Sequence, residues 1–237
     1  MRFLLVLALA PIAACNSAAD TPNNLHTASD NVQRSWNLSG FEGVETRGST
    51  DISISTGKDF SIRGTGSAEA LDRLQLSIEN KDLRVDMKKR DWPTRSGDNA
   101  HLFITMPRIA RASTRGSGDI DIDRAEGDFD GAIAGSGDMH IGALSGGNVS
   151  LSITGSGDID ASGNADMLTI AIAGSGDVSG RALKAARANV SIAGSGDATA
   201  TVTGPAQVAL HGSGDVDLGS SARCTISKAG SGDVHCG

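Results

Sequence analysis

The stretch "TRGSGDIDID" (residues 114–123) contains the tetrapeptide that decides the fold, Gly-Ser-Gly-Asp. This tetrapeptide occurs seven times in the second half of the chain, at intervals of 18 to 20 residues. The seven copies begin at Gly116, Gly135, Gly155, Gly174, Gly194, Gly212 and Gly230. A nearly constant interval of this length is typical of architectures in which structural repeats stack on one another.

The residues on both sides of each copy alternate between apolar and polar or small side chains. After the aspartate comes an apolar, a polar and an apolar position, as in Ile159-Asp160-Ala161. Before the first glycine, the second and the fourth position upstream are each branched and apolar in five of the seven copies, as in Ile170 and Ile172. Alternation with a period of two indicates β-strands, so each repeat carries two short strands, joined by the Gly-Ser-Gly corner and closed by a looser second corner.

Two strands and two corners in about 19 residues cannot bury a core alone, so each unit must lie on its neighbour. Equivalent strands of successive coils then pair in parallel, about 4.8 Å apart. The sequence therefore predicts an all-β protein, a parallel β-solenoid with apolar columns inside. The corner glycines are expected to supply positive φ angles and to lack a Cβ where adjacent corners crowd together.

The corner aspartates form a column of seven like charges. Neighbouring carboxylates about 5 Å apart repel by roughly 1 kcal/mol even in a water-like dielectric. Two explanations are open: each carboxylate accepts backbone N–H groups at its corner, or the column binds a cation such as Ca²⁺. We favour the first, because both the glycine-to-aspartate spacing and the period differ from those of calcium-binding repeats. No metal or cofactor is expected.

The first residues, "MRFLLVLALAPIAAC", form an export signal, because Arg2 precedes an apolar run too short to span a membrane. The run ends at Ile12-Ala13-Ala14-Cys15, which resembles a bacterial lipobox, although an ordinary signal peptide with a chance cysteine is the alternative. We therefore expect a signal peptide over residues 1–14, lipidation of Cys15, and a polar tether over residues 15–34.

Two further cysteines, Cys224 and Cys236, lie in the last repeat. In an exported protein such a pair tends to form a disulfide, and the alternative is two free thiols packed as small apolar groups. Both positions belong to inward columns on the two strands joined by the last corner, so we expect a disulfide that fixes the open end. Lys228, in an otherwise apolar inward position of the same coil, fits an end that is open to water.

The charge is unevenly distributed. The chain has 28 acidic and 21 basic residues, a net charge of −7. Residues 116–237 carry 15 acidic and 6 basic residues, whereas residues 16–115 carry 13 and 14. An acidic repeat region argues against direct binding of nucleic acid or anionic lipid.

The first part of the domain shows a degenerate repeat with persistent strand alternation. "GSTDISIST" from Gly48 is a degenerate copy of the corner. "SAEALDRLQ" predicts a helical turn, and residues 79–82 are expected to form the turn of a hairpin. A strand "HLFITMP" follows the loop over residues 88–100. No linker interrupts residues 35–237, so we expect one domain there, with the Gly-Ser-Gly-Asp coils over residues 116–237.

The order of segments resembles a known family. "WNLSGFEGV", "DISISTG", a small helix, "KDLRV" and "LFITMPRI" precede the tandem GSGD coils, over roughly residues 35–237. This order is similar to that of the putative autotransporter-adhesin head-GIN domain family, bacterial envelope proteins of largely unknown function. The resemblance implies a right-handed parallel β-helix and an adhesin-like role, with no catalytic residues to transfer. The terminal cysteine pair is not an expected feature of the family.

The sequence does not indicate an enzyme. The chain has no Tyr, and its two tryptophans, Trp36 and Trp92, lie outside the repeats, whereas polysaccharide-active enzymes need aromatic platforms and unlike carboxylates. His140 and His235 lie beside acidic positions, but as polar surface residues rather than as a catalytic or metal site.

We therefore expect a non-enzymatic, adhesin-like lipoprotein of the bacterial envelope, held by Cys15 at the outer membrane, on its periplasmic or outer face. Its partners would be the membrane, through the lipid, and a surface glycan or protein, but not nucleic acid. A carbohydrate-active β-helix enzyme and a purely structural envelope protein are the alternatives.

Overall fold

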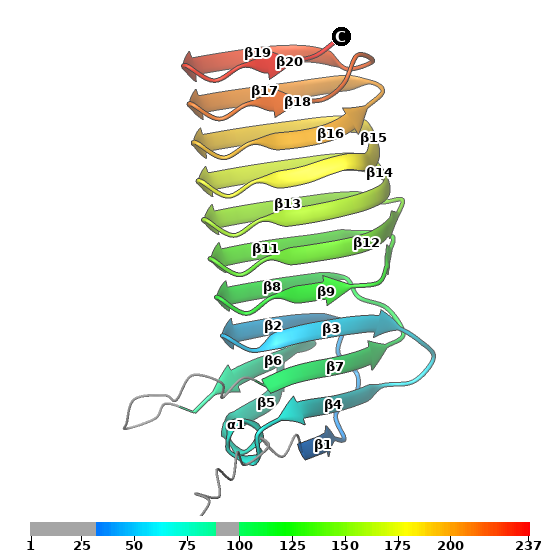
Figure 1. Cartoon of the computed structure of the whole chain (residues 1–237). Helices are drawn as coiled ribbons and strands as arrows, with labels where there is room; N and C mark the ends of the chain where they lie inside the picture. Colours follow the sequence, from blue (N-terminus) through cyan, green and yellow to red (C-terminus); the bar gives the residue numbers. More distant parts are fainter. Residues whose placement is uncertain (1–31, 89–99) are drawn as a thin grey trace, which may run out of the picture.

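The computed structural model describes residues 32–88 and 100–237. In this part of the chain the fold consists of strands β1–β20 and one short helix, α1 (Ala68–Arg73), and the strands stack into a tall column (Figure 1). The all-β class and the solenoid predicted from the repeat are confirmed. The first coil consists of the strands on either side of the degenerate corner at Gly48, β2 (Gly43–Gly48) and β3 (Asp51–Thr56).

Each coil contributes one strand to each of two faces. Face A contains the strands that run into the Gly-Ser-Gly corners, and face B contains the strands that leave them. After β2, face A is formed by β8 (Arg111–Gly116), β11 (Phe129–Gly135), β13 (Asn148–Gly155), the ends of β14 (Ile159–Gly174) and β15 (Val178–Gly194), β17 (Pro205–Gly212) and β19 (Arg223–Gly230). After β3, face B is formed by β9 (Ile120–Ile122), β12 (Met139–Ser145), the starts of β14 and β15, β16 (Ala198–Val202), β18 (Val216–Asp217) and β20 (Val234–His235).

Equivalent strands of successive coils pair in parallel on both faces, as predicted. On face A the register keeps the corner glycines aligned, for example Gly155 with Gly174 and Gly174 with Gly194. The looser edge differs from the expectation of two separate short strands per coil. The strands β14 and β15 each continue around this edge as one bent strand, with a shift of register after Asp160 (Figure 1). The short strand β10 (Ala125–Glu126) pairs with the end of β12 at the same edge.

The core consists of side-chain columns that run along the solenoid between the two faces. The column two positions before the corner contains buried branched residues at equivalent register, namely Ile133, Ile153, Ile172, Ile192 and Leu210. In the first two coils the same column holds Thr46 and Thr114. The Thr114 hydroxyl donates to the carbonyl oxygen of Gly118 at 2.8 Å, which satisfies a buried polar group.

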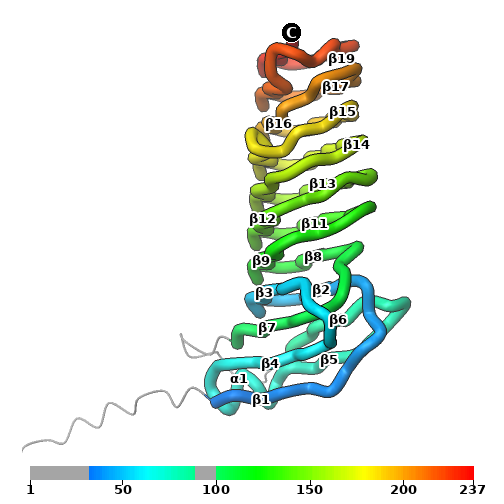
Figure 2. Tube along the Cα trace, turned by 90° about the vertical axis from the view of Figure 1, so that its right-hand side faces the viewer, coloured from blue at the N-terminus to red at the C-terminus, as the bar shows by residue number. Residues whose placement is uncertain are grey.

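A cap closes the N-terminal end of the solenoid (Figure 2). On face B, β4 (Ser61–Gly66) pairs antiparallel with both β1 (Val32–Trp36) and β7 (Ala100–Met106), and β7 also pairs in parallel with β3. On face A, the hairpin of β5 (Leu74–Glu79) and β6 (Asp82–Met87) continues the sheet, because β6 pairs in parallel with β2. Helix α1 lies at this end, opposite the C-terminus, and buries Ala70 and Leu71.

Several local predictions for this part are confirmed. The helical turn begins at the N-cap Ser67, whose hydroxyl accepts the N–H of Ala70 at 3.1 Å. The hairpin turns at Asn80 and Lys81, both with positive φ, as a two-residue hairpin turn requires. The described part of the fold starts with the strand β1 at Val32. The predicted signal peptide, Cys15 and most of the tether lie outside the described residues, as does most of the predicted loop over 88–100.

Candidate functional surfaces

The corner glycines have the two properties expected of them. The first glycine of each copy has a φ between +131° and +145°. A Cβ on it would lie 1.8–2.3 Å from the carbonyl oxygen of the equivalent glycine in the coil below. The second glycine has no positive φ, but a Cβ there would lie 1.8–2.4 Å from a carbonyl oxygen of the coil below. The first glycine is therefore required for both conformation and space, and the second for space alone.

The corner aspartates form a hydrogen-bonded ladder. The backbone N–H of each aspartate donates to Oδ1 of the aspartate in the coil below, at 2.7–3.1 Å. The first acceptor of this ladder is Asp51, in the degenerate first corner. A charge-assisted hydrogen bond contributes about 1.5–3 kcal/mol, which offsets the repulsion of about 1 kcal/mol between neighbours. Backbone capping is thus the role of these side chains, with the correction that the N–H donor belongs to the next coil.

Face B carries the outward row of acids and histidines that the sequence indicated. His140 pairs in register with Asp121 on one side and Asp160 on the other, and all three are exposed. Together with Asp119, Asp138 and Asp158 they line a shallow groove of about 310 Å³. A second groove of about 310 Å³ lies near the C-terminal end, between the upper corner aspartates, Asp217 and His235.

These grooves lack the features of a catalytic or metal site. The corner acids repeat in equivalent surroundings, so no single pair is set apart as acid and base. Within residues 32–88 and 100–237, no group of three or more His, Cys, Asp or Glu side chains is arranged to hold a metal ion. Trp36 is half-buried against Gly64, and Trp92 lies outside the described residues.

Face A presents a different surface, an uncharged groove of about 420 Å³ that crosses four coils. Its lining residues are Thr169, Ile170, Ala171, Asn189, Val190, Ser191, Gln207, Val208, Ala209, Thr225, Ile226 and Ser227. Ile226 stands four residues before the corner glycine, a position that the repeat predicts to point inward, and its register partner in the coil below is Val208. The side chain of Ile226 is instead 47% exposed, whereas Val208 is 2% exposed, because no coil of the described residues lies above β19.

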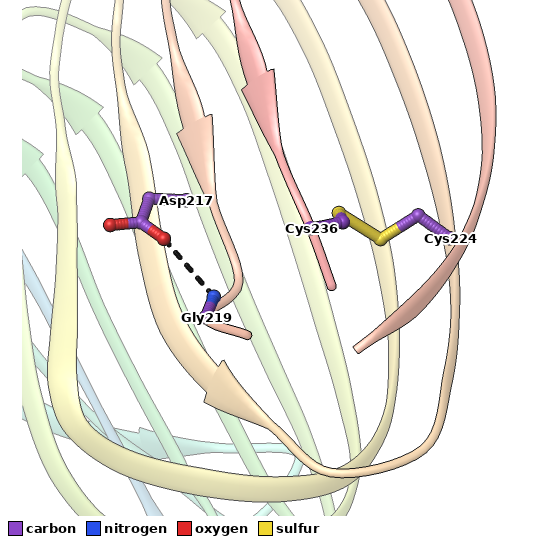
Figure 3. Close-up of a disulfide and its surroundings, with 4 residues drawn as sticks. All are labelled: Asp217, Gly219, Cys224 and Cys236. Carbon is purple, nitrogen blue, oxygen red and sulfur yellow. Dashed lines mark hydrogen bonds between the residues drawn. A yellow bond between two sulfur atoms is a disulfide. The ribbon is translucent and has the colours of Figure 1, made fainter. Parts of the chain in front are cut away.

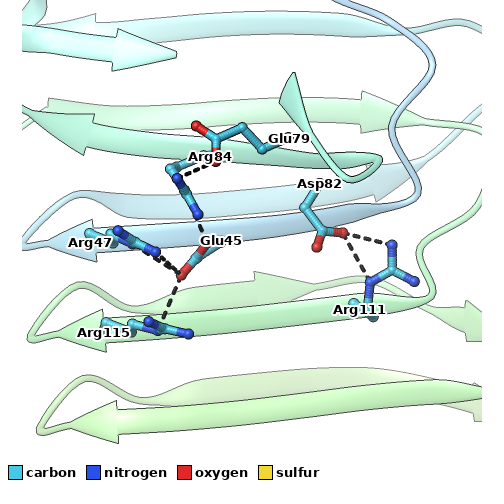
Figure 4. Close-up of polar contacts among 7 residues, drawn as sticks. All are labelled: Glu45, Arg47, Glu79, Asp82, Arg84, Arg111 and Arg115. Carbon is cyan, nitrogen blue, oxygen red and sulfur yellow. Dashed lines mark hydrogen bonds and ion pairs between the residues drawn. The ribbon is translucent and has the colours of Figure 1, made fainter. Parts of the chain in front are cut away.

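At the lower end of face A, three arginines converge on one carboxylate (Figure 4). Glu45 accepts hydrogen bonds from Arg47 at 3.0 Å and Arg84 at 3.2 Å, and its carboxylate lies 3.1 Å from Nε of Arg115. Burial raises the pKa of Glu45, but the arginine hydrogen bonds and charges outweigh this effect, so its pKa lies below the usual value. The cluster joins β2, β6 and β8, and therefore ties the cap to the first coils.

Sequence reasoning missed this cluster, because two of the three partners of Glu45, Arg84 and Arg115, lie far away along the chain. A neighbouring pair strengthens the same junction: Arg111 donates from Nε and Nη2 to Asp82 at 3.0 and 2.8 Å. The pKa of Arg111 is raised, chiefly by this hydrogen bond. The basic segment "RIARASTR" (residues 108–115) supplies Arg111 and Arg115, but a run of charges does not by itself specify the partners.

The C-terminal coil contains the predicted disulfide (Figure 3). Cys224 on β19 and Cys236, directly after β20, are bonded across the interior, with their Cα atoms 6.2 Å apart. In the same coil Lys228 lies beside Leu210 of the coil below, and its Nζ lies 3.3 Å from the carboxylate of Asp233. The two strands of the last coil are thus joined both covalently and by an ion pair at the corner.

Comparison with known structures supports the same architecture. A putative adhesin from Bacteroides fragilis is similar with a TM-score of 0.78 and 19% identity, over 88% of this chain and 98% of that one. A putative lipid binding protein from Parabacteroides distasonis has a TM-score of 0.68 and 22% identity, over 89% and 98% of the two chains. A putative adhesin from Parabacteroides merdae has a TM-score of 0.66 and 15% identity, over 87% and 96%.

Two further findings bear on the kind of protein. A search of proteins with curated descriptions gave no match. Among the described residues, no helix has the length and apolar character needed to cross a membrane. The family model named "Putative auto-transporter adhesin, head GIN domain" matches residues 40–222, and the chain belongs to this family.

Proposed function

We propose that this protein is a non-enzymatic, adhesin-like lipoprotein of the bacterial cell envelope, which presents its solenoid as a binding surface. The observation that carries the proposal is the contrast between the two faces. Face B and the corner are lined by repeated acids, whereas the groove on face A has no charged side chain across four coils. The family and the similar structures named as putative adhesins support the same role.

The uncharged groove suits an uncharged partner. The chain as a whole carries a net charge of −7, so most of its surface repels other acidic molecules. On face A, hydroxyl and amide side chains such as Thr169, Asn189 and Gln207 offer hydrogen bonds without this repulsion. A surface glycan or an uncharged protein segment is therefore the proposed class of partner.

The position of the proposed anchor determines what the solenoid presents. Sixteen residues separate Cys15 from β1, and β1 lies in the cap at the end opposite the C-terminus (Figure 1). Lipid on Cys15 would therefore hold the capped end toward the membrane and direct the last coils away from it. The groove lies in these last coils, β14 to β19, where a partner from outside would meet it first.

Two serines on opposite faces of β15 provide a matched pair of substitutions that tests the proposal. Ser191 lines the groove on face A, and Ser179 is exposed on face B, in the same strand. Binding of the purified protein to an array of glycans and extracellular proteins would be compared for Ser191→Arg and Ser179→Arg. We expect Ser191→Arg to weaken binding by roughly tenfold or more, as the loss of a central contact does, and Ser179→Arg to leave it unchanged. Equal effects of both substitutions, or loss with Ser179→Arg alone, would remove face A as the binding surface.

Whether the domain faces outward is tested separately. Protease treatment of intact cells should degrade the protein if it lies on the outer surface, while a periplasmic control protein stays intact. Full protection of the solenoid would exclude a role in contacts between the cell and its surroundings.

A further inference from the structure

The two ends of the solenoid differ in how they are covered. The N-terminal end is closed by α1 and by the strands of the cap, whereas β19 and β20 have no strand beyond them in the described part of the chain (Figures 1 and 2). An uncovered strand presents a row of free backbone groups and is a template for pairing with another chain. The exposed side chain of Ile226 adds an apolar contact to this edge.

Lys228 places a charge at the end of a column that is apolar from Ile133 to Leu210. Its register partner is Leu210, and below Leu210 the column continues through Ile192, Ile172, Ile153 and Ile133. These lower residues are at most 2% exposed. The inward position of β19 next to the corner, on which an added coil would lie, therefore carries a charge.

Asp233 marks the same end in the corner ladder. Each lower corner aspartate accepts the N–H of the aspartate in the coil above, as Asp215 accepts that of Asp233 at 2.7 Å. No coil in the described part of the chain lies above the last carboxylate, its side chain is 91% exposed, and Nζ of Lys228 lies 3.3 Å away instead. The lysine thus places a cation where the ladder would otherwise continue with an N–H donor.

We infer that Lys228 is a stop residue, which prevents a second copy of this chain from stacking on the C-terminal end. A second copy is the occupant to which this end is best matched, because its last coil has the same two strands and the same columns. A two-fold axis normal to both faces would pair β19 with β19 in antiparallel orientation and keep the two Asp233 corners at opposite edges. Such stacking would bury two lysine ammonium groups against apolar columns, which desolvation strongly opposes.

The test uses the full chain with Cys15→Ala, so that no lipid contributes to association. Sedimentation velocity over a concentration series would compare this parent with Lys228→Leu and with Lys184→Leu. Lys184 is exposed on β15 in the middle of the solenoid, so its substitution matches the loss of charge and the gain of apolar surface. We expect Lys228→Leu to self-associate roughly tenfold or more tightly than the parent, and Lys184→Leu to behave like the parent.

A second substitution locates the contact at the end of the solenoid. Adding Ile226→Glu to Lys228→Leu places charge on the exposed edge and should restore the monomer, whereas adding Ser191→Glu on face A should not. Circular dichroism establishes that each variant is folded. A folded Lys228→Leu variant that stays monomeric, or dimers that Ile226→Glu leaves intact, would overturn the inference. So would a parent that already associates and loses this association with Ile226→Glu.

Discussion

Replacing Gly176 by alanine isolates the crowding between coils from any strain of the backbone. Gly176 is the second glycine of its corner and does not have a positive φ. A Cβ there would lie 2.0 Å from the carbonyl oxygen of Gly157 in the coil below and 3.0 Å from Cγ2 of Ile153. To bring the oxygen to an ordinary contact of 3.4 Å, the corner must move by 1.4 Å, the difference between 3.4 and 2.0 Å.

The loss of stability caused by Gly176→Ala depends on which neighbouring atoms can move away from the added Cβ. Overpacking costs about 1–3 kcal/mol when flexible side chains move, and here the neighbour is a backbone carbonyl, so we expect about 3 kcal/mol or more. Gly146→Ala is the matched control for conformation, because φ is +72° and no atom lies within 4 Å of the added Cβ. Its cost is about 1–2 kcal/mol. The stiffening of the unfolded chain by alanine, about 0.4–1 kcal/mol, is common to both substitutions and cancels.

Urea unfolding, monitored by circular dichroism, ranks these variants by stability. Gly176→Ala should lower the midpoint more than Gly146→Ala, and Gly174→Ala, which combines a φ of +143° with an approach of 2.0 Å, should lower it most. Ser175→Ala, in the same corner, should have little effect, because its side chain is exposed. If Gly176→Ala were no more destabilising than Gly146→Ala, crowding between corners would not be the reason for the second glycine.

Four other predictions address the anchor, the core, the charged cluster and the disulfide. Radioactive fatty acid should label the wild type and not Cys15→Ala, and equal labelling would exclude lipidation there. Ile172→Asp should unfold the domain or cost several kcal/mol, because it buries an unpaired carboxylate, whereas Asp177→Asn keeps its acceptor and should change the melting temperature little. Glu45→Gln should lower stability at neutral pH by about 1–3 kcal/mol. Because the pKa of Glu45 is lowered in the folded state, its carboxylate stabilises the fold at pH values above the ordinary pKa of about 4.3. The difference in stability between the wild type and Glu45→Gln should therefore shrink as the pH falls below this value. Cys224→Ala should lower the free energy of unfolding by about 3 kcal/mol relative to the oxidised wild type. Under reducing conditions the substitution should have no measurable effect, because the wild type then lacks the disulfide as well.

The repeat half of the fold could be predicted because several independent signals agree in each coil. The alternation around Ile170 and Ile172 specifies strands, the fixed interval specifies stacking, and the glycines specify where the chain turns. A one-residue shift of register would expose every inward column at once, so the pairing is strongly determined. The course of the looser edge was less predictable, since residues 161–166 carry no repeated motif, and there β14 continues without a break.

The cap could be predicted only element by element. The hairpin turn at Asn80 and the capped start of α1 at Ser67 are local signals, and both were found. The pairing of β4 with β1 and β7 joins segments without a common motif, so nothing along the chain indicated it. The cluster at Glu45 depends on a different pairing, that of β6 with β2, which no motif along the chain indicated either.

The last coil shows how periodicity can mislead. Alignment on the corner places Ile226 in the same column as Val208, and the column does continue in register. Burial, however, depends on the coil above as well as on the position in the repeat, and no coil of the described residues covers β19. The sequence did mark this end in two ways, with Lys228 in an apolar column and with a cysteine pair.

The repetition that specifies the fold also limits the chemistry that the solenoid can perform. Catalysis needs neighbouring groups held in unlike surroundings, whereas Asp158, Asp177 and Asp197 each accept the same backbone N–H from the coil above. A surface of equivalent coils instead offers the same weak contact several times over, about 4.8 Å apart. Contacts made together add in free energy, so affinity grows with the number of coils that a partner covers. Such a surface is suited to holding an extended partner, which is the property that an adhesin-like protein requires.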